Sequence, residues 1–206
     1  MWKWKFFIDF EKEEKWLQDM SKQGMQLEKA AFGYTFRHTK PEDANIRIDY
    51  RTFKTKNDFL DYCTLFEDSG WKHIAGKKNS GTQYFKKIDQ DGNDDIFSDK
   101  QSKAGKYKRL SNYFFQFALF YLPILFTFFM VDIIDFKVFI NPKLLYYTPG
   151  LWEMSGKSFW FAFLFETPFA FMRGFLWLII PIMTLLFIIY GYKARKLYQR
   201  EMISNS

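Results

Sequence analysis

Two stretches of the chain are predominantly apolar and carry no charge. Residues 113–131 and 175–192 contain no charged side chain over 19 and 18 positions. A helix of either length rises about 27–28 Å at ~1.5 Å per residue, close to the ~30 Å hydrocarbon core of a bilayer. The pattern predicts a two-helix transmembrane hairpin within residues 110–206. Its helices are expected at about 113–134 and 174–193, with an aromatic outer loop at 135–173.

Residues 1–87 carry the same order of predicted elements twice: a strand, an amphipathic helix and two further strands. In the first half these elements fall at residues 5–9, 11–23, 25–30 and 34–38. In the second half they fall at residues 45–51, 58–69, 71–74 and 83–87. Two β-α-β-β units in tandem predict an α+β domain related to the ferredoxin-like fold. We expect a single sheet with both helices on one face, because right-handed crossovers place them on the same side.

Local signals mark the ends of both predicted helices. Glu13 and Glu14 lie in the first turn of the first helix, where the helix dipole favours negative charge. Asn57 is the expected N-cap of the second helix. Gly24 and Gly70 follow the last turns, as glycines at the C′ position do.

Residues 88–109 are polar, first acidic and then basic, and they predict a solvated linker between the domain and the membrane region. The acidic half is similar to a calcium-binding loop in composition only. Counted from Asp89, Gly92 takes the fourth position rather than the sixth, and Lys100 takes the twelfth, where such a loop needs Glu. The spacing therefore favours a linker over a calcium site.

Basic residues gather at the outer flanks of the two apolar stretches, in a chain with net charge +7 and pI near 9.3. Because Lys and Arg near span ends favour the cytoplasmic side, both termini are predicted to be cytoplasmic in a plasma-membrane protein. Attraction to anionic lipid head groups, about 1 kcal/mol per residue, explains this charge without nucleic acid as a partner. The membrane-surface residues are Lys103, Lys106, Lys108, Arg109, Lys193, Arg195 and Lys196.

The remaining composition agrees with a cytoplasmic domain. Residues 1–5 contain no long apolar core, so no signal peptide is predicted. The single cysteine, Cys63, excludes an intrachain disulfide and is expected to pack among apolar neighbours rather than react. Core packing, rather than stacking on a ligand, is expected for Trp16, Trp71, Tyr84 and Phe85.

The predicted outer loop contains an intensely aromatic segment, residues 158–172, which Glu166 and Pro168 interrupt. This segment is too short to span a bilayer alone. We expect an interfacial helix on the outer face that can continue into the second span. A third span is the alternative, and it would place the basic C-terminus outside the cell.

Linked motifs run through residues 6–87. Their residues are Phe10, Glu13, Glu14, Trp16, Leu17, Met20, Gly24, Met25, Leu27, Tyr34, Phe36, Asp49, Tyr50, Arg51, Phe66, Glu67, Asp68, Gly70, Trp71, Tyr84 and Phe85. With this series the chain resembles the domain of unknown function 2812 family. The resemblance implies a domain followed by one or more membrane helices, and many members sit beside PadR-like transcriptional regulators in Gram-positive bacteria. Met25 departs from the family, which more often has Trp after the glycine, and no catalytic residue is implied.

The sequence contains no arrangement typical of catalysis. It lacks a Gly-rich phosphate loop, a Gly-x-Ser-x-Gly motif and a Cys-x-x-Cys motif. His38 and His73 each sit at a predicted strand end among Lys and Arg, which favours surface histidines over metal ligands. We therefore expect no enzyme activity, no catalytic or metal site and no cofactor.

Four polar residues are the candidate partner-binding site. Alternation along two predicted strands places them on the side of the sheet that the helices leave open. A protein partner or an anionic ligand would suit this surface, and a solvated strand face is the alternative. The residues are Arg37, Arg47, Asp49 and Arg51.

These features predict an integral membrane protein of a bacterial envelope, whose cytoplasmic domain has an interaction or regulatory role in envelope sensing or signalling. The alternative is an accessory subunit of a membrane export or transport complex, with helices kinked at Pro123 and Pro181 packed against a larger transporter. A membrane-tethered enzyme ranks third. Expected partners are the lipid bilayer and a cytoplasmic protein or membrane complex, and the oligomeric state is left open.

Overall fold

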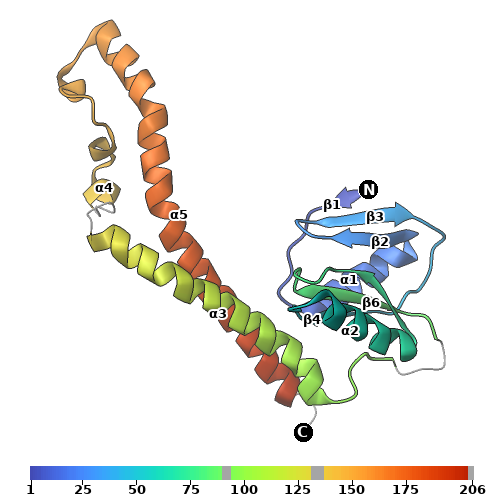
Figure 1. Cartoon of the computed structure of the whole chain (residues 1–206). Helices are drawn as coiled ribbons and strands as arrows, with labels where there is room; N and C mark the ends of the chain where they lie inside the picture. The colour runs from blue at the N-terminus through green and yellow to red at the C-terminus, as the bar shows by residue number, and fades with distance from the viewer. Residues whose placement is uncertain (90–93, 131–136, 204–206) are drawn as a thin grey trace. The chain divides into compact units, whose positions relative to one another are not determined.

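The computed structural model describes residues 1–89, 94–130 and 137–203 (Figure 1). The chain divides into two compact units. The first unit combines Met1–Tyr113 with Tyr190–Ser206, and the second is Phe114–Ile189. The N-terminal domain therefore forms one unit with the start of one long helix and the end of another.

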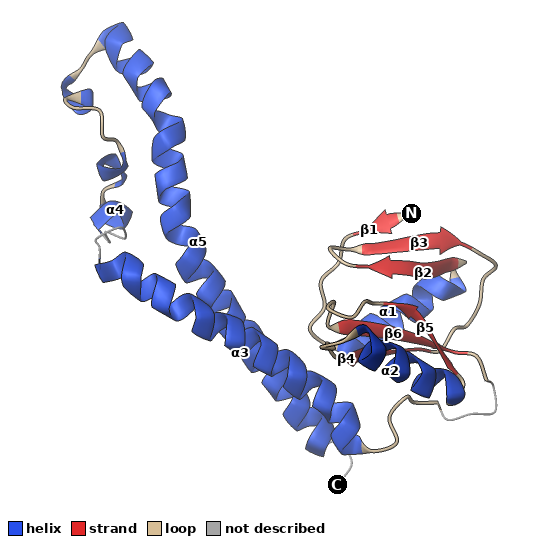
Figure 2. Cartoon of the chain, in the orientation of Figure 1, coloured by secondary structure: helices blue, strands red, loops and turns tan. Residues whose placement is uncertain are grey.

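The α+β part of the first unit consists of two β-α-β-β repeats (Figure 2). The first repeat contains β1 (Trp2–Lys3), α1 (Phe10–Lys22), β2 (Met25–Ala30) and β3 (Tyr34–His38). The second repeat contains β4 (Ile46–Tyr50), α2 (Lys56–Asp68), β5 (Trp71–Ala75) and β6 (Thr82–Lys87). Both sheets are antiparallel and share one plan, with orders β1-β3-β2 and β4-β6-β5. The predicted repeat is thus present in the topology.

The prediction of a single sheet is wrong, because the domain has two three-stranded sheets. Their nearest strands, β2 and β5, lie beside each other. Each of these edges carries an irregularity in its ladder, between Leu27 and Lys29 in β2 and between His73 and Ala75 in β5. A bulge bends and twists its strand locally. Two twisted edges facing each other give a physical reason why no ladder joins the sheets.

The sequence predicted both helices on one face of the sheet, and this prediction is also wrong. Consecutive residues of a strand point to opposite faces of its sheet. On β6, the Tyr84 hydroxyl donates a hydrogen bond to Glu13 of α1, whereas Phe85 packs against Tyr62 and Phe66 of α2. The helices therefore cover opposite faces of the second sheet.

The helix ends follow local chemistry. Gly24 and Gly70 have φ values of +75° and +81° and follow the last turns of α1 and α2, as predicted. The N-cap of α2 is Thr55 rather than Asn57. The Thr55 hydroxyl accepts from the Asp58 amide, and the Asp58 carboxylate accepts from the Thr55 amide, which forms a capping box.

The predicted first strand is displaced. β1 comprises only Trp2–Lys3, and residues 5–9, the predicted strand, lie outside any strand. Phe7 packs against Trp16 and Tyr34, and Phe6 lies 5.3 Å from the Tyr190 ring. Phe7, which is half-buried, therefore packs between elements instead of pairing in a sheet, whereas Phe6 stays exposed.

Two long helices carry the apolar stretches. α3 (Lys100–Met130) begins inside the region predicted to be a linker, so only residues before 100 connect the domain to a helix. α5 (Gly156–Ile203) contains both the aromatic segment 158–172 and the second predicted span. The end of the first predicted span, residues 131–134, lies outside the described residues. Both helices are long and apolar enough to cross a membrane.

The second unit contains the end of α3 from Phe114, the start of α5 up to Ile189, and the connection between them, with α4 (Lys137–Ile140), η1 (Pro142–Leu145) and η2 (Leu151–Glu153). The Phe187 ring lies 5.4 Å from Phe117 and 5.7 Å from Tyr121, so α3 and α5 pack through aromatic side chains. Glu166 accepts from the Thr148 hydroxyl at 2.7 Å and pairs with Arg173. This polar contact holds the connection against α5.

Candidate functional site

The notable polar chemistry of the first unit lies where α1 meets the start of α3. Glu13 and Glu14, which the sequence placed in the first turn of a helix, are only 3% and 9% exposed. Adjacent helix residues point about 100° apart, and the two carboxylates accordingly have different partners.

Glu13 joins the two sheets. Its Oε1 accepts hydrogen bonds from the hydroxyls of Tyr34 on β3 and Tyr84 on β6, both at 2.7 Å. Burial raises the pKa of Glu13 to about 7, against the lowering effect of the two hydroxyl donors. The pKa of Tyr84 is also raised, chiefly by burial and then by the nearby Glu13 charge. Glu13 is thus a carboxyl group that titrates near neutral pH inside the fold.

Glu14 binds the start of α3. The Lys106 ammonium lies 3.1 Å from Glu14 Oε1, also donates to the Ile48 carbonyl at 3.2 Å, and is 1% exposed. The Ile48 amide donates to the same carboxylate oxygen at 3.0 Å. Burial raises the pKa of Glu14, and the charges of Lys106 and Arg47 oppose this effect. Because a buried ion is costly without its partner, Glu14 ties α3 to the domain.

Arg109, one turn further along α3, makes a second attachment. Its guanidinium pairs with Asp49 and donates to the Tyr50 carbonyl. The Tyr62 hydroxyl of α2 donates to the other oxygen of Asp49 at 2.8 Å. Asp49, 2% exposed, therefore links β4, α2 and α3.

The predicted partner-binding surface does not exist as one open face. Asp49 is buried, and Arg47 is half-buried and lies 3.8 Å from Glu14. Arg51 is exposed above the Tyr62 ring, with 5.6 Å to the centroid. Arg37 is exposed on the other sheet, where it donates to Gln26. Alternation grouped the β4 residues correctly, but α2 and α3 cover the face that was expected to be open.

The basic residues near the spans have different environments. Lys106 and Arg109 bind the domain, and Lys103 pairs with Asp95 at 3.2 Å. Lys108 is exposed. After the second span, Lys193, Arg195 and Lys196 are also exposed. Two of the four cations before the first span are therefore fold-forming residues rather than lipid contacts.

The end of α5 also contacts the domain. Arg200 pairs with Asp9 at 3.4 Å and with Glu11 at 2.8 Å. The Ser111 hydroxyl donates to the Gly191 carbonyl at 2.9 Å, which joins α3 and α5 directly. Both long helices are therefore fastened to the α+β domain within the first unit.

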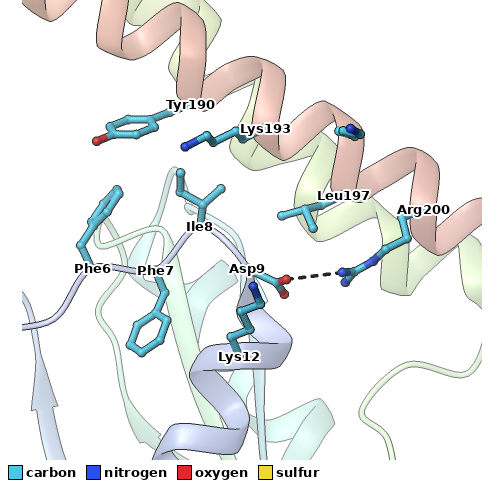
Figure 3. Close-up of a pocket in the computed structure, with 10 residues that line it drawn as sticks. Phe6, Phe7, Ile8, Asp9, Lys12, Tyr190, Lys193, Leu197 and Arg200 are labelled. Carbon is cyan, nitrogen blue, oxygen red and sulfur yellow. Dashed lines mark hydrogen bonds and ion pairs between the residues drawn. The ribbon is translucent and has the colours of Figure 1, made fainter.

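A cavity of about 670 Å³ opens beside these contacts (Figure 3). Residues 6–9 and Lys12 line one side, and one face of α5 from Tyr190 to Arg200 lines the other. Figure 3 shows Phe6 and Tyr190 at one end and the Asp9–Arg200 pair at the other. The cavity is therefore partly aromatic and partly charged.

Other candidate chemistry is structural. His73 forms a hydrogen bond with Gln83 at 3.0 Å, and burial lowers its pKa. Cys63 packs against the buried cluster that includes Trp71 and Phe85, in agreement with the packing prediction, and burial raises its pKa. Within residues 1–89, 94–130 and 137–203, no group of three His, Cys, Asp or Glu residues is arranged to hold a metal ion.

The sequence model of a family described as protein of unknown function (DUF2812) matches residues 9–119. The match extends past the α+β domain and includes the start of α3, with Lys106 and Arg109. Searches of curated proteins and of solved structures gave no match.

Proposed function

The chain belongs to the DUF2812 family, and we propose that it is a membrane-anchored regulatory protein of a bacterial cell, whose cytoplasmic domain responds to the state of the bilayer through two spanning helices. The observation that carries this proposal is the fastening of the domain to the helix ends. A flexible linker would isolate the domain from the helices, whereas buried ion pairs transmit movement of a helix end.

Insertion into a bilayer is supported by the exposure of the long helices. In the most apolar 18-residue segment of each helix, only 6% of α3 and 12% of α5 is buried. A core helix of a water-soluble protein would have such a segment buried. Large apolar side chains such as Phe120, Phe126 and Leu185 are instead exposed, as lipid contacts require.

An orientation with both termini in the cytoplasm is supported by two features. The α+β domain and the end of α5 belong to one compact unit, so they lie on the same side of any bilayer that the hairpin crosses. The exposed cations at the end of α5 favour the cytoplasmic side.

Cysteine labelling tests the orientation. In a chain with Cys63→Ser, single cysteines are introduced by Lys56→Cys on α2 and by Lys157→Cys at the start of α5. In intact cells, a membrane-impermeant maleimide is expected to label the second position only, and both positions after lysis. Labelling of the α2 position in intact cells would overturn the orientation.

Hydrogen exchange tests the response to the bilayer. Full-length protein is placed in nanodiscs of short-chain or long-chain phosphatidylcholine, and amide exchange is measured in α1 and β4. We expect exchange to differ at least about threefold between the two bilayers for the wild type and for Lys108→Met, but not for Lys106→Met, which lacks the buried ion pair. Equal domain exchange of the wild type in both bilayers would overturn the proposal.

The same preparations separate the alternative role. An accessory subunit of a transport complex would bind a larger membrane protein through its spanning helices. Stoichiometric co-purification with an ATPase or permease, together with domain exchange that is insensitive to bilayer thickness, would favour that role.

A further inference from the structure

The cavity between residues 6–12 and the end of α5 has an excess of positive charge. Four cations line it, Lys12, Lys193, Lys196 and Arg200, against one carboxylate, Asp9. Asp9 is already paired with Arg200, which also binds Glu11. Among the described residues, Lys12 and Lys196 have no carboxylate partner, and Lys193 lies 5.9 Å from the Tyr190 ring centroid. An anion entering the cavity would therefore meet cations that the protein itself does not neutralise.

The cavity also has an apolar part. Phe6, Ile8, Tyr190 and Leu197 contribute to its lining. In Figure 3, Ile8 lies between the aromatic end and the charged end, close to Lys193. An inorganic anion would not use this surface, whereas an amphiphile would contact both parts. The volume of about 670 Å³ lies in the range of small-molecule sites and exceeds what a single phosphate group fills.

The position of the cavity along α5 indicates the source of such an amphiphile. The uncharged stretch of α5 ends at Tyr192, and Lys193 and Lys196 follow within one turn. In a spanning helix, this point lies at the level of the lipid phosphates of the cytoplasmic leaflet. The cavity would therefore open where anionic head groups are concentrated.

We infer that this cavity binds the head group of an anionic glycerophospholipid from the cytoplasmic leaflet. The phosphodiester contacts Lys193, Lys196 and Lys12, and the glycerol and first methylene groups contact Ile8 and Leu197. The inference rests on the proposed function, since it requires the end of α5 to lie at a cytoplasmic membrane surface. It adds a lipid-specific site to that role. Because Lys12 of α1 lines the cavity, the lipid composition of the bilayer would act directly on α1.

Lipid retention tests the site. Full-length protein is purified from nanodiscs of phosphatidylcholine with one-fifth phosphatidylglycerol, and native mass spectrometry counts the bound phosphatidylglycerol as detergent is increased. The Lys193→Gln/Lys196→Gln chain is compared with the Lys108→Gln/Arg195→Gln chain, which loses the same charge from exposed positions outside the cavity. We expect retention to weaken about 10-fold or more in the first chain and less than about twofold in the second, because only Lys193 and Lys196 line the cavity and a direct hydrogen bond to a charged group contributes about 1.5 kcal/mol or more.

Equal losses in the two chains would mean general attraction to an anionic surface and would overturn the site. A second arm adds inorganic phosphate or glycerol 1-phosphate at millimolar concentration, and we expect neither to displace the lipid. Displacement by either would identify a site for soluble phosphate compounds instead. Phe6 is an exposed residue of the apolar lining, so Phe6→Ser is expected to weaken lipid retention without changing the fold, and an unchanged retention would count against burial of the lipid's apolar part in the cavity.

The experiment separates this inference from the proposed function. If cysteine labelling places the domain outside the cell, the proposed function fails and the lipid site fails with it. If labelling and the bilayer response hold while phosphatidylglycerol is not retained, only the lipid site is overturned.

Discussion

The two β-α-β-β repeats share one strand order but use their helices in different ways. α1 lies against β2 and β4, and it buries two carboxylates that contact both sheets and α3. α2 lies against β5 and fully buries only Tyr62. The same topology thus gives a helix with buried charged residues in one repeat, and a helix that buries no charged residue in the other. What surrounds a helix, rather than its place in the repeat, decides whether charged groups are buried on it.

Among substitutions that test this contrast, loss of the Lys106 ammonium is expected to change the free energy of unfolding most. In Lys106→Met, Glu14 stays buried without its ion-pair partner, and the free energy of unfolding of the domain should fall by about 3 kcal/mol or more. Native-state hydrogen exchange of β4 and β6 in the full-length protein measures this change. Lys103→Met is the matched control, because its pair with Asp95 is partly exposed and should contribute less than about 1 kcal/mol. Equal effects of the two substitutions would show that the burial of the Glu14–Lys106 pair does not set its contribution to stability.

The Glu13 carboxyl should make α1 the source of pH-dependent stability. Its pKa is raised from 4.5 to about 7 in the folded state, so the folded domain binds more protons than the unfolded chain between these values. Stability is then greatest below pH ~4.5 and declines as the pH rises to about 7, by about 3 kcal/mol from this group. Glu13→Gln, a neutral isostere, should abolish this decline and be more stable than the wild type at pH 8. Parallel pH profiles of the two proteins in hydrogen exchange would contradict the assignment.

Removal of the N-cap of α2 should have the smallest effect. Thr55→Ala loses the side-chain acceptor of the capping box and is expected to reduce the free energy of unfolding by about 1 kcal/mol. Asn57, the second residue of α2, provides the control. Asn57→Ala should change the free energy of unfolding by less than about 0.5 kcal/mol. Amide exchange in α2 measures both. A larger loss of stability for Asn57→Ala than for Thr55→Ala would favour Asn57 as the N-cap, as the sequence predicted.

The start of α3 shows what the sequence could reveal and what was missed. Ala104, Tyr107, Leu110, Ser111 and Phe114 are buried at intervals of three and four residues, which is a helical pattern. The high lysine content between them favoured a linker. Helical spacing, read across residues 100–114, would have predicted an amphipathic helix continuous with the first span.

Asp49 shows a different limit. Its strand and its face were predictable from alternation, and β2 and β3 were predicted with the bounds that the structure has. What covers that face depends on where α2 and the start of α3 pack, and no local pattern encodes this placement. The paired partners of Glu13 and Glu14 were unpredictable for the same reason, because they come from β3, β6 and α3.

The boundary between β2 and β5 has a mechanical consequence. No ladder of backbone hydrogen bonds crosses it in the described part of the domain, so side chains alone resist shear along this line. Sliding one sheet past the other would break far fewer backbone bonds than unpairing a strand. The domain is therefore expected to yield along this line before a strand unpairs, and the Glu13 contacts with Tyr34 and Tyr84, one in each sheet, resist such sliding.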